Sequence, residues 1–261
     1  MCLITPRMAK AVGLGLLTVN FGMDPAFATE VAAPHGATTS VANESQPVVV
    51  SRPKRVNFEQ EDPSTDARHV ADWVADSNDN HNLPFMIVDK KHARVFVFHA
   101  DGRLRGAAPA LLGLALGDDS VPGIGERALT SIHPDERTTP AGRFEAALDR
   151  NLAGKEILWV DYDTAISLHP VITSNLKERR GERLATPSPD DNRISYGCIN
   201  VALDFFNHVV RPAFAGTNGI VYVLPETRSA QQVFASYDVD ERVRLQPGAA
   251  KIDINAARRA D

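Results

Sequence analysis

The chain has 261 residues, of which 43% are hydrophobic, 23% charged and 7% aromatic, and its formal net charge is −5. This balance is typical of a globular protein, and it excludes a fully disordered chain and a collagen-like repeat. The acidic net charge, with no block of basic residues, argues against a nucleic-acid partner. Two cysteines in this length cannot build a disulfide scaffold.

The first 28 residues have the pattern of a secretory signal peptide. Arg7 and Lys10 precede an apolar stretch at 11–21, and Ala26-Phe27-Ala28 gives the small-x-small pattern of a cleavage site. The apolar stretch is too short to span a bilayer. We therefore expect cleavage after Ala28, export to the periplasm and no integral membrane segment in the mature chain. The alternative is an amphipathic N-terminal helix of a cytosolic protein, which helix-breaking residues at 20–25 disfavour.

Two segments precede the main domain. Residues 29–62 are rich in Ala, Ser, Thr, Pro and charge, which predicts a flexible tether. Residues 63–82 predict a helix that starts near Ser64 and ends in the polar cluster at 77–80. Val70, Trp73 and Val74 recur at helical spacing, so we expect this helix to dock on the main domain through Trp73.

From residue 83 to about 225 the pattern changes to short runs rich in Val, Ile and Phe, separated by turn-rich loops. Strands are predicted at 85–89, 93–100, 103–106, 143–148, 156–162, 165–169 and 220–224. The fold class expected from this pattern is mainly β, a sandwich or barrel-like domain with a few short helices. One of those helices is expected directly after Cys198, with Asn200 as its N-cap. Residues 226–261 are polar and are expected to form a C-terminal extension.

Cys198 is the only cysteine of the expected mature chain, and it lies in the sequence Ser195-Tyr196-Gly197-Cys198-Ile199-Asn200. A helix N-terminus directly after the thiol would favour its thiolate, and Gly197 would allow a sharp turn whose amides face an oxyanion. These features favour a nucleophilic cysteine. The alternative is a small buried apolar residue, which is a common role of a cysteine outside a disulfide.

A nucleophilic cysteine needs a base, and His169 is the best candidate because it ends an apolar strand where its ring can be held rigidly. His133, in a loop, and His208, on the helix after the cysteine, are the competitors. A zinc site built from Cys198 with histidines and an aspartate is disfavoured because the ligand spacing fits no known pattern.

Together, His169, the motif Ser195-x-Gly197-Cys198-x-Asn200 and the segment Thr139-Pro-Ala-Gly-Arg-Phe144 resemble the L,D-transpeptidase catalytic domain, the YkuD family. The resemblance covers roughly residues 84–225. It implies a periplasmic β-sandwich enzyme that acts on the bacterial cell wall and binds peptidoglycan stem peptides.

The resemblance also implies the chemistry. Cys198 would attack the third residue of a tetrapeptide stem, D-Ala would leave, and an acceptor amine would resolve the thioester. His169 would act as general base and acid, without any metal or organic cofactor. Backbone amides around Tyr196, Gly197 and Cys198 would bind the oxyanion. Ser195 would support this loop, and Asn200 would organise the loop or cap the helix.

This chain departs from the family pattern at three places. Tyr196 stands where the family has His, and Pro170 follows the histidine where the family has Gly or Ser, so a backbone carbonyl would have to orient the imidazole. In addition, 25 residues separate His169 from Ser195, which is more than the motif usually has. This longer segment is basic, and with Arg193 it is hypothesised to bind stem-peptide carboxylates; the arginines concerned are Arg179, Arg180, Arg183 and Arg193. The alternative is a solvated charged loop.

Three functions stay open on the sequence. The first is a cysteine-dependent L,D-transpeptidase for cell-wall cross-linking or remodelling. The second is a hydrolase on the same fold, an L,D-carboxypeptidase or an anchor-cleaving amidase. The third is a peptidoglycan-binding module without catalysis.

Overall fold

The structure is a computed structural model that describes residues 52–245. The signal peptide expected at 1–28, most of the expected tether and residues 246–261 lie outside the described residues. Residues 52–245 all belong to one compact unit. They form a mainly β domain with a few short helices, which confirms the expected fold class.

The strands are β1 (Phe85–Asp89), β2 (Arg94–Phe98), β3 (Leu104–Pro109), β4 (Leu112–Gly113), β5 (Gly142–Arg150), β6 (Glu156–Asp161), β7 (Ile166–Pro170), β8 (Arg193–Ser195), β9 (Ile199–Val201) and β10 (Gly219–Val223). The α-helices are α1 (Thr65–Ser77), α2 (Arg180–Ala185), α3 (Leu203–Phe205), α4 (Arg211–Phe214), α5 (Ala230–Phe234) and α6 (Val239–Leu245), and a π-helical turn at Phe206–Val210 joins α3 to α4. None of the helices within residues 52–245 is long and apolar enough to cross a membrane.

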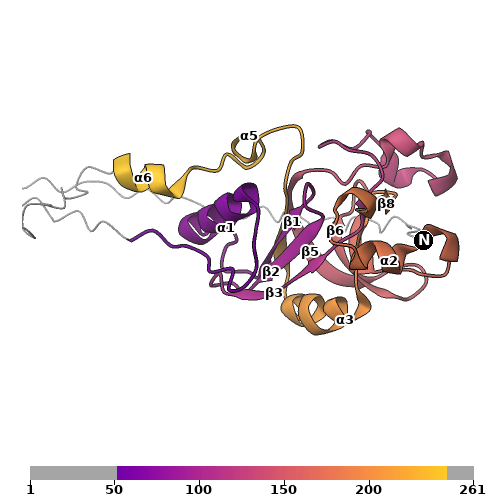
Figure 1. Cartoon of the computed structure of the whole chain (residues 1–261), viewed down its shortest axis with the longest axis horizontal. Coiled ribbons are helices and arrows are strands. Elements are labelled where there is room, and N and C mark those ends of the chain that lie inside the picture. Colours follow the sequence, from indigo (N-terminus) through magenta and orange to yellow (C-terminus); the bar gives the residue numbers. More distant parts are fainter. Residues whose placement is uncertain (1–51, 246–261) are drawn as a thin grey trace, which may run out of the picture. The chain divides into compact units, whose positions relative to one another are not determined.

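Eight strands form one sheet in the order β3-β2-β1-β10-β5-β6-β7-β9, and β4 pairs with β8 in a second, small sheet. Most neighbours are antiparallel, but β1 pairs with β10 and β7 pairs with β9 in parallel. Figure 1 shows the strands at the centre of the domain, with α1 and α3 on different sides of them. The two parallel pairs join segments far apart in sequence, so the fold depends on long-range contacts.

The sheet is buried on both faces, which explains why the first strand reads as a continuous apolar run instead of an alternating one. Met86 and Val88 of β1 point into one core, and Phe85 and Ile87 point into the other. The first core also receives Leu158 of β6 and further side chains from β7 and β9, so the sheet curls and its two halves share one interior. The segment from α3 to α4 closes this core on its other side.

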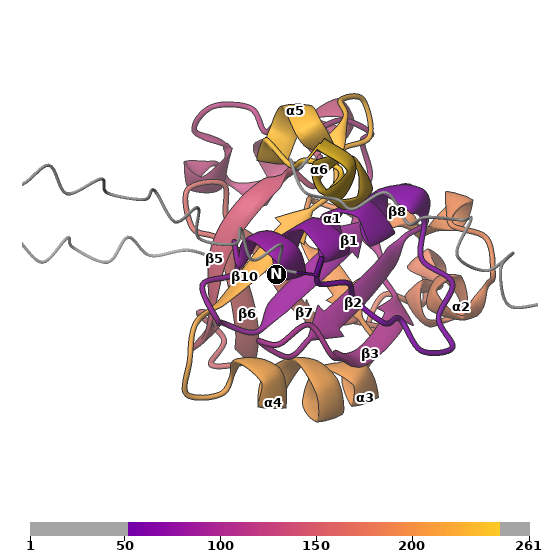
Figure 2. The same ribbon diagram turned by 90° about the vertical axis from the view of Figure 1, so that its left-hand side faces the viewer.

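The second core lies beneath α1 (Figure 2). Ser64 caps the helix, its Oγ accepting a hydrogen bond of 3.1 Å from the amide of Ala67, as the sequence predicts. Trp73 is 6% exposed and packs edge-on against Tyr222 of β10, at 6.1 Å between ring centroids. The predicted docking contact through Trp73 is therefore present.

The last part of the expected tether is packed against this second core. Val56 and Phe58 are buried, and Phe58 meets the rings of Phe96 and Phe98 edge-on at 5.2 and 5.4 Å. Two apolar side chains in a polar segment are a weak signal in the sequence. Together with the ion pairs Arg55–Asp72 and Arg94–Glu61, they hold residues 52–62 on the domain.

The expectation that Asn200 caps a helix directly after Cys198 was wrong. The residues after the cysteine form strand β9, and α3 begins only at Leu203. The backbone of Asn200 is bonded to Leu111, with both N–H···O distances at 2.8 Å, while β9 pairs with β7 on its other side. These ladder bonds outweigh the capping preference of an asparagine, and because α3 begins five residues after the cysteine, its N-terminus is not directly beside the Cys198 thiol as expected.

The packing of Trp73 leads to a test of the second core. We expect Trp73→Ala to lower the free energy of unfolding by about 3–5 kcal/mol, because it removes a buried aromatic side chain and leaves a cavity against Tyr222. Urea unfolding followed by far-UV circular dichroism measures this loss. Leu176→Ala is the control, since Leu176 is 84% exposed and should change stability by about 0.5 kcal/mol or less. An equal effect of the two substitutions would contradict the docking role of α1.

Candidate active site

The parallel pairing of β7 and β9 brings the predicted cysteine and histidine to one face of the sheet. His169 lies opposite Asn200, and Leu168 lies opposite Ile199. Leu168 and Ile199 point into the first core. Because side chains alternate along a strand, His169 and Asn200 face away from that core, as do Ser167 and Cys198.

The Cys198 side chain is 9% exposed and lies against β7. The hydroxyl of Ser167 donates to its Sγ at 3.6 Å, and Sγ lies 3.7 Å from the carbonyl oxygen of Ala165. Ser195 holds the turn before the sulfur: its Oγ donates to the carbonyl of Cys198 at 2.6 Å and accepts from the amide of Gly197 at 3.0 Å. Ser195 thus has the geometry of a loop-supporting residue.

Gly197 adopts a backbone conformation that favours glycine, with φ at 123°. A Cβ there would lie 2.7 Å from both the carbonyl oxygen of Thr138 and Cδ1 of Ile166. The turn therefore needs glycine for its conformation and for the space around it. The Gly197 amide is already bonded to Ser195, and the amides of Tyr196 and Cys198 are the other two that the resemblance implies for the oxyanion.

The imidazole of His169 is held at both ring nitrogens. Nδ1 lies 2.8 Å from the carbonyl oxygen of Pro170, and Nε2 lies 3.2 Å from Nδ2 of Asn200. A backbone carbonyl thus orients the ring, as expected from the proline after His169, which can offer no hydroxyl. Such a contact fixes the orientation of the ring.

A cavity of about 310 Å³ opens beside these residues and is lined by His169, Cys198 and Asn200. Its other walls come from the loop at 120–138, the turn at 164–166 and the segment at 172–180. The lining mixes apolar and charged side chains: Ile124, Leu129, Ile132 and Ile172 with Arg127, Glu178 and Arg180. A thiol and an imidazole on one rigid face of such a cavity are suited to nucleophilic attack on a carbonyl group.

Of the four arginines hypothesised to bind carboxylates, Arg180 alone lines this cavity. Arg179 is 69% exposed and pairs with Glu182. Arg183 donates to the backbone carbonyls of Glu178 and Asp191 within its own loop.

Arg193 is mostly buried and forms an ion pair with Glu226, away from the cavity lining. The four positive charges therefore have four different surroundings, and they form no common basic surface.

Tyr196, which stands where the L,D-transpeptidase pattern has a histidine, forms part of the cavity wall. The guanidinium of Arg137 stacks on its ring, with Cζ 3.9 Å from the ring centroid. Arg137 is itself held by the carbonyl of Ile132 through Nη2 at 3.1 Å. This cation–π contact fixes the tyrosine ring in place.

The competing histidines lie outside the cavity lining. His133 is exposed and begins a short 3-10 turn, and His208 is exposed with its Nδ1 2.9 Å from the carbonyl of Asp204. Within residues 52–245 no group of three or more His, Cys, Asp or Glu side chains is arranged to hold a metal ion.

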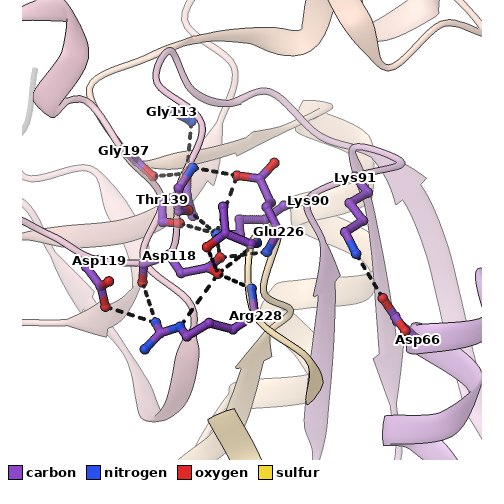
Figure 3. Close-up of polar contacts among 12 residues, drawn as sticks. Asp66, Lys90, Lys91, Gly113, Asp118, Asp119, Thr139, Gly197, Glu226 and Arg228 are labelled. Carbon is purple, nitrogen blue, oxygen red and sulfur yellow. Dashed lines mark hydrogen bonds and ion pairs between the residues drawn. The ribbon is translucent and has the colours of Figure 1, made fainter. Parts of the chain in front are cut away.

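A buried lysine supports the loop that packs against the cysteine turn (Figure 3). Lys90 is 1% exposed, and its ammonium donates to the carbonyls of Gly117 and Thr139 at 2.5 and 2.9 Å and to the carboxylate of Asp118 at 3.1 Å. Glu226 lies 3.6 Å from the same ammonium. All three ammonium hydrogens are used, which is what a buried charge requires.

Thr139 transmits this support to the cysteine turn. Its hydroxyl donates to the carbonyl of Gly197 at 2.8 Å and accepts from the amide of Gly113 at 2.9 Å. Thr139 opens the Thr-Pro-Ala-Gly segment that belongs to the family resemblance, and the structure gives it a direct contact with the residue before Cys198.

Asp118 joins the same network to the segment after β10. It accepts hydrogen bonds from the amides of Glu226, Thr227 and Arg228 at 2.6, 2.9 and 2.9 Å, and from the Thr227 hydroxyl at 2.6 Å. Burial by itself would raise the pKa of Asp118, but the bonds from Thr227, Glu226 and Lys90 outweigh it and hold that pKa well below the usual range. Burial lowers the pKa of Lys90, and the Asp118 and Glu226 carboxylates oppose the shift. The expected C-terminal extension is therefore anchored at its start to the site-forming loop.

Sequence reasoning missed Lys90, Thr139 and Ser167 as site-supporting residues. Lys90 precedes Lys91, and the pair reads as an exposed turn; Lys91 is indeed on the surface, 3.2 Å from Asp66 (Figure 3). Ser167 could have been predicted from the sequence, because it lies two residues before His169 on the same strand and its side chain must therefore point to the same face.

No family model matches this chain, and no curated protein matches it. Solved structures similar to it include the helical cell-shape-determining protein Pgp2 of Campylobacter jejuni, at 14% identity and a TM-score of 0.39, over 67% of this chain and 58% of that one. An L,D-transpeptidase of Mycobacterium smegmatis is similar at 16% identity and a TM-score of 0.31, over 54% and 58% of the two chains. An L,D-transpeptidase of Enterococcus faecium is similar at 17% identity and a TM-score of 0.31, over 54% and 49%. This chain therefore spans less than two thirds of their lengths, and likenesses at this level carry no argument about function.

The position of Gly197 leads to a sharp test of the turn. We expect Gly197→Ala to lower any Cys198-dependent activity about a hundredfold or more, because backbone strain and the contact with Thr138 must displace the sulfur. The rate of thiol alkylation by iodoacetamide measures the change even without a substrate. Gly154→Ala is the matched control: Gly154 also has a positive φ, 72°, but nothing lies within 4 Å of its Cβ position. Equal alkylation rates in the wild type and the Gly197 variant would contradict the role of the turn.

The hydrogen bonds and ion pairs of Asp118 should make the stability of the fold depend on pH. A carboxyl whose folded-state pKa lies below the ordinary 3.8 contributes stability above that value and loses it as the pH falls further. Asp118→Asn should cost about 3 kcal/mol at pH 7, since it removes a charged partner of buried Lys90. Urea unfolding from pH 7 to pH 2.5 measures the difference in free energy of unfolding between the wild type and Asp118→Asn. We expect this difference to narrow below pH 4. A difference that stays constant over this pH range would show that the charge of Asp118 contributes nothing to the stability of the fold.

Proposed function

We propose that this protein is a cysteine-dependent acyltransferase of L,D-transpeptidase type that acts on peptidoglycan stem peptides in the periplasm. The observation that carries the proposal is the common face of β7 and β9, where His169 and Cys198 line one cavity next to a glycine turn. The motif Ser195-x-Gly197-Cys198-x-Asn200 supports the family, and the pattern of residues 1–28 supports export.

In the first half-reaction, His169 takes the proton of the Cys198 thiol, and the sulfur attacks the carbonyl carbon of the third stem residue. The amides of Tyr196 and Cys198 stabilise the oxyanion. When the tetrahedral intermediate collapses, the C–N bond breaks, the amine of D-Ala takes the proton from the imidazolium, and a thioester remains on Cys198. No metal or organic cofactor takes part in these steps.

In the second half-reaction, an amine of another stem attacks the thioester and gives its proton to His169. The imidazolium then returns a proton to the departing Cys198 sulfur, which restores the thiol. Water in place of the amine would give a tripeptide, so the occupant of the acceptor side decides between a transferase and a hydrolase. The buried apolar side chains of the cavity wall, Ile124 and Ile132, favour exclusion of water and hence transfer.

The test uses the purified protein, with Cys198→Ala as its inactive counterpart. Both are incubated with a disaccharide-tetrapeptide, and the intact protein and the muropeptides are weighed by mass spectrometry. We expect an acyl adduct on the wild type together with released D-Ala, and neither with the Cys198 variant. Ser188→Ala, in an exposed loop, controls for handling and should behave as the wild type.

The products distinguish the remaining functions. Cross-linked or exchanged stems support the transpeptidase, and tripeptide alone replaces it with an L,D-carboxypeptidase. Neither adduct nor release, in a protein that still binds purified cell-wall sacculi, would contradict catalysis and leave a peptidoglycan-binding module.

A further inference from the structure

We propose that Arg180 is a positioning residue: it fixes the side-chain amide of Asn200, and the amide in turn fixes which nitrogen of His169 carries the proton. The inference deepens the proposed function and rests on His169 acting as the base in it. Arg180 begins α2, inside the long segment between the histidine and the cysteine motif. It was hypothesised to bind a substrate carboxylate, and its contacts give it a different role.

The first step is the orientation of the Asn200 amide. Nη1 of Arg180 lies 2.7 Å from Oδ1 of Asn200, whose side chain is fully buried. A guanidinium has only donors, so the atom that faces it must be the amide oxygen. The Arg180 side chain is 13% exposed and is held at Nε by the carboxylate of Glu178, so it keeps this position.

The second step is the protonation of the ring. With Oδ1 held by Arg180, the NH₂ group of Asn200 faces His169 Nε2 at 3.2 Å and the Cys198 carbonyl at 3.4 Å. An amide NH₂ can only donate, so Nε2 must present its lone pair. The single proton of the neutral ring is therefore on Nδ1, where it is donated to the Pro170 carbonyl at 2.8 Å. Nε2 is then the basic nitrogen of the ring.

The third step concerns the charged form. In an imidazolium, the Nε2–H would face the NH₂ group of Asn200, donor against donor, so this arrangement disfavours it. Among the charged groups that line the cavity with the ring, Glu178 is paired with Arg180, and Arg127 is paired with Glu136. These contacts therefore match the neutral ring, which is the form that can act as a base.

The primary test is an NMR measurement of the His169 ring nitrogens, which needs no peptidoglycan. In the wild type we expect the Nδ1–H tautomer. In Arg180→Met the Asn200 amide can turn over, with its NH₂ toward Glu178 and its oxygen toward the ring. The ring should then shift toward Nε2–H, and the pKa of His169 should rise by about one unit, because both N–H groups of the imidazolium have acceptors. Arg180→Lys keeps a donor for Oδ1 and should restore the wild-type tautomer.

Arg179→Met is the matched control, since it removes the neighbouring arginine and its ion pair with Glu182 without touching Asn200; its His169 should titrate as in the wild type. An Nε2–H tautomer in the wild type, or an unchanged tautomer and pKa in Arg180→Met, would overturn the proposal. If the Met variant does not fold, Asn200→Asp presents an oxygen to the ring with Arg180 intact, and it must raise the pKa of His169; an unchanged pKa again overturns the proposal.

Turnover separates positioning from substrate binding. We expect Arg180→Met to lower kcat and to move the acid limb of its pH profile to higher pH, with KM for the tetrapeptide unchanged within about twofold. A rise in KM alone, with the pH profile unchanged, would return Arg180 to carboxylate binding and overturn the positioning role. If the wild type transfers or releases nothing, the proposed function fails, while the NMR result still decides the Arg180 proposal by itself.

Discussion

The register between β7 and β9 is the constraint on which the site depends. It is set by apolar side chains, because Leu168 and Ile199 lie opposite one another and point into the first core. A slip by one residue would turn His169 into that core and expose Leu168, at a large cost in hydrophobic burial. The positions of the thiol and the imidazole are therefore guaranteed by residues that take no part in any chemistry. Core packing alone thus holds the thiol and the imidazole together, although they lie on elements that are distant in sequence.

The polar support of the cysteine turn follows a different rule. Lys90 is buried with carboxylates and carbonyls that use all its hydrogens, so its charge is tolerated only while the partners keep their places. Thr139 receives one of these bonds and contacts Gly197, while Asp118 binds the backbone of Glu226 and its neighbours. The segments at 117–118, 139 and 226–228 are thus made mutually dependent. The network specifies one arrangement of the loops in a region where apolar packing cannot.

The elements that the sequence predicted well are those governed by local pattern. The strands at the core, the cap of α1 at Ser64 and the strand-end position of His169 all follow from runs of three to eight residues. The errors concern long-range pairing. Asn200 has the chemistry of a helix cap, but its pairing with β7 and Leu111 comes from distant segments, and so does the burial of Lys90. The contact of Arg180 with Asn200 could not be predicted from the sequence either, because only the folded loop brings the two side chains together.

The double pairing of β9 has a consequence for how a peptide can approach the sulfur. β9 is the last strand of the large sheet, and a strand in that position ordinarily offers its backbone to an extended peptide. Here Leu111 already occupies that edge, bonded to both polar atoms of the Asn200 backbone. At Asn200 a bound chain therefore cannot add itself to the sheet, and selection of its sequence and stereochemistry there must come from side chains over the open face. Divergence among proteins built this way would then be concentrated in the loops around that face, while the strands beneath them stay the same.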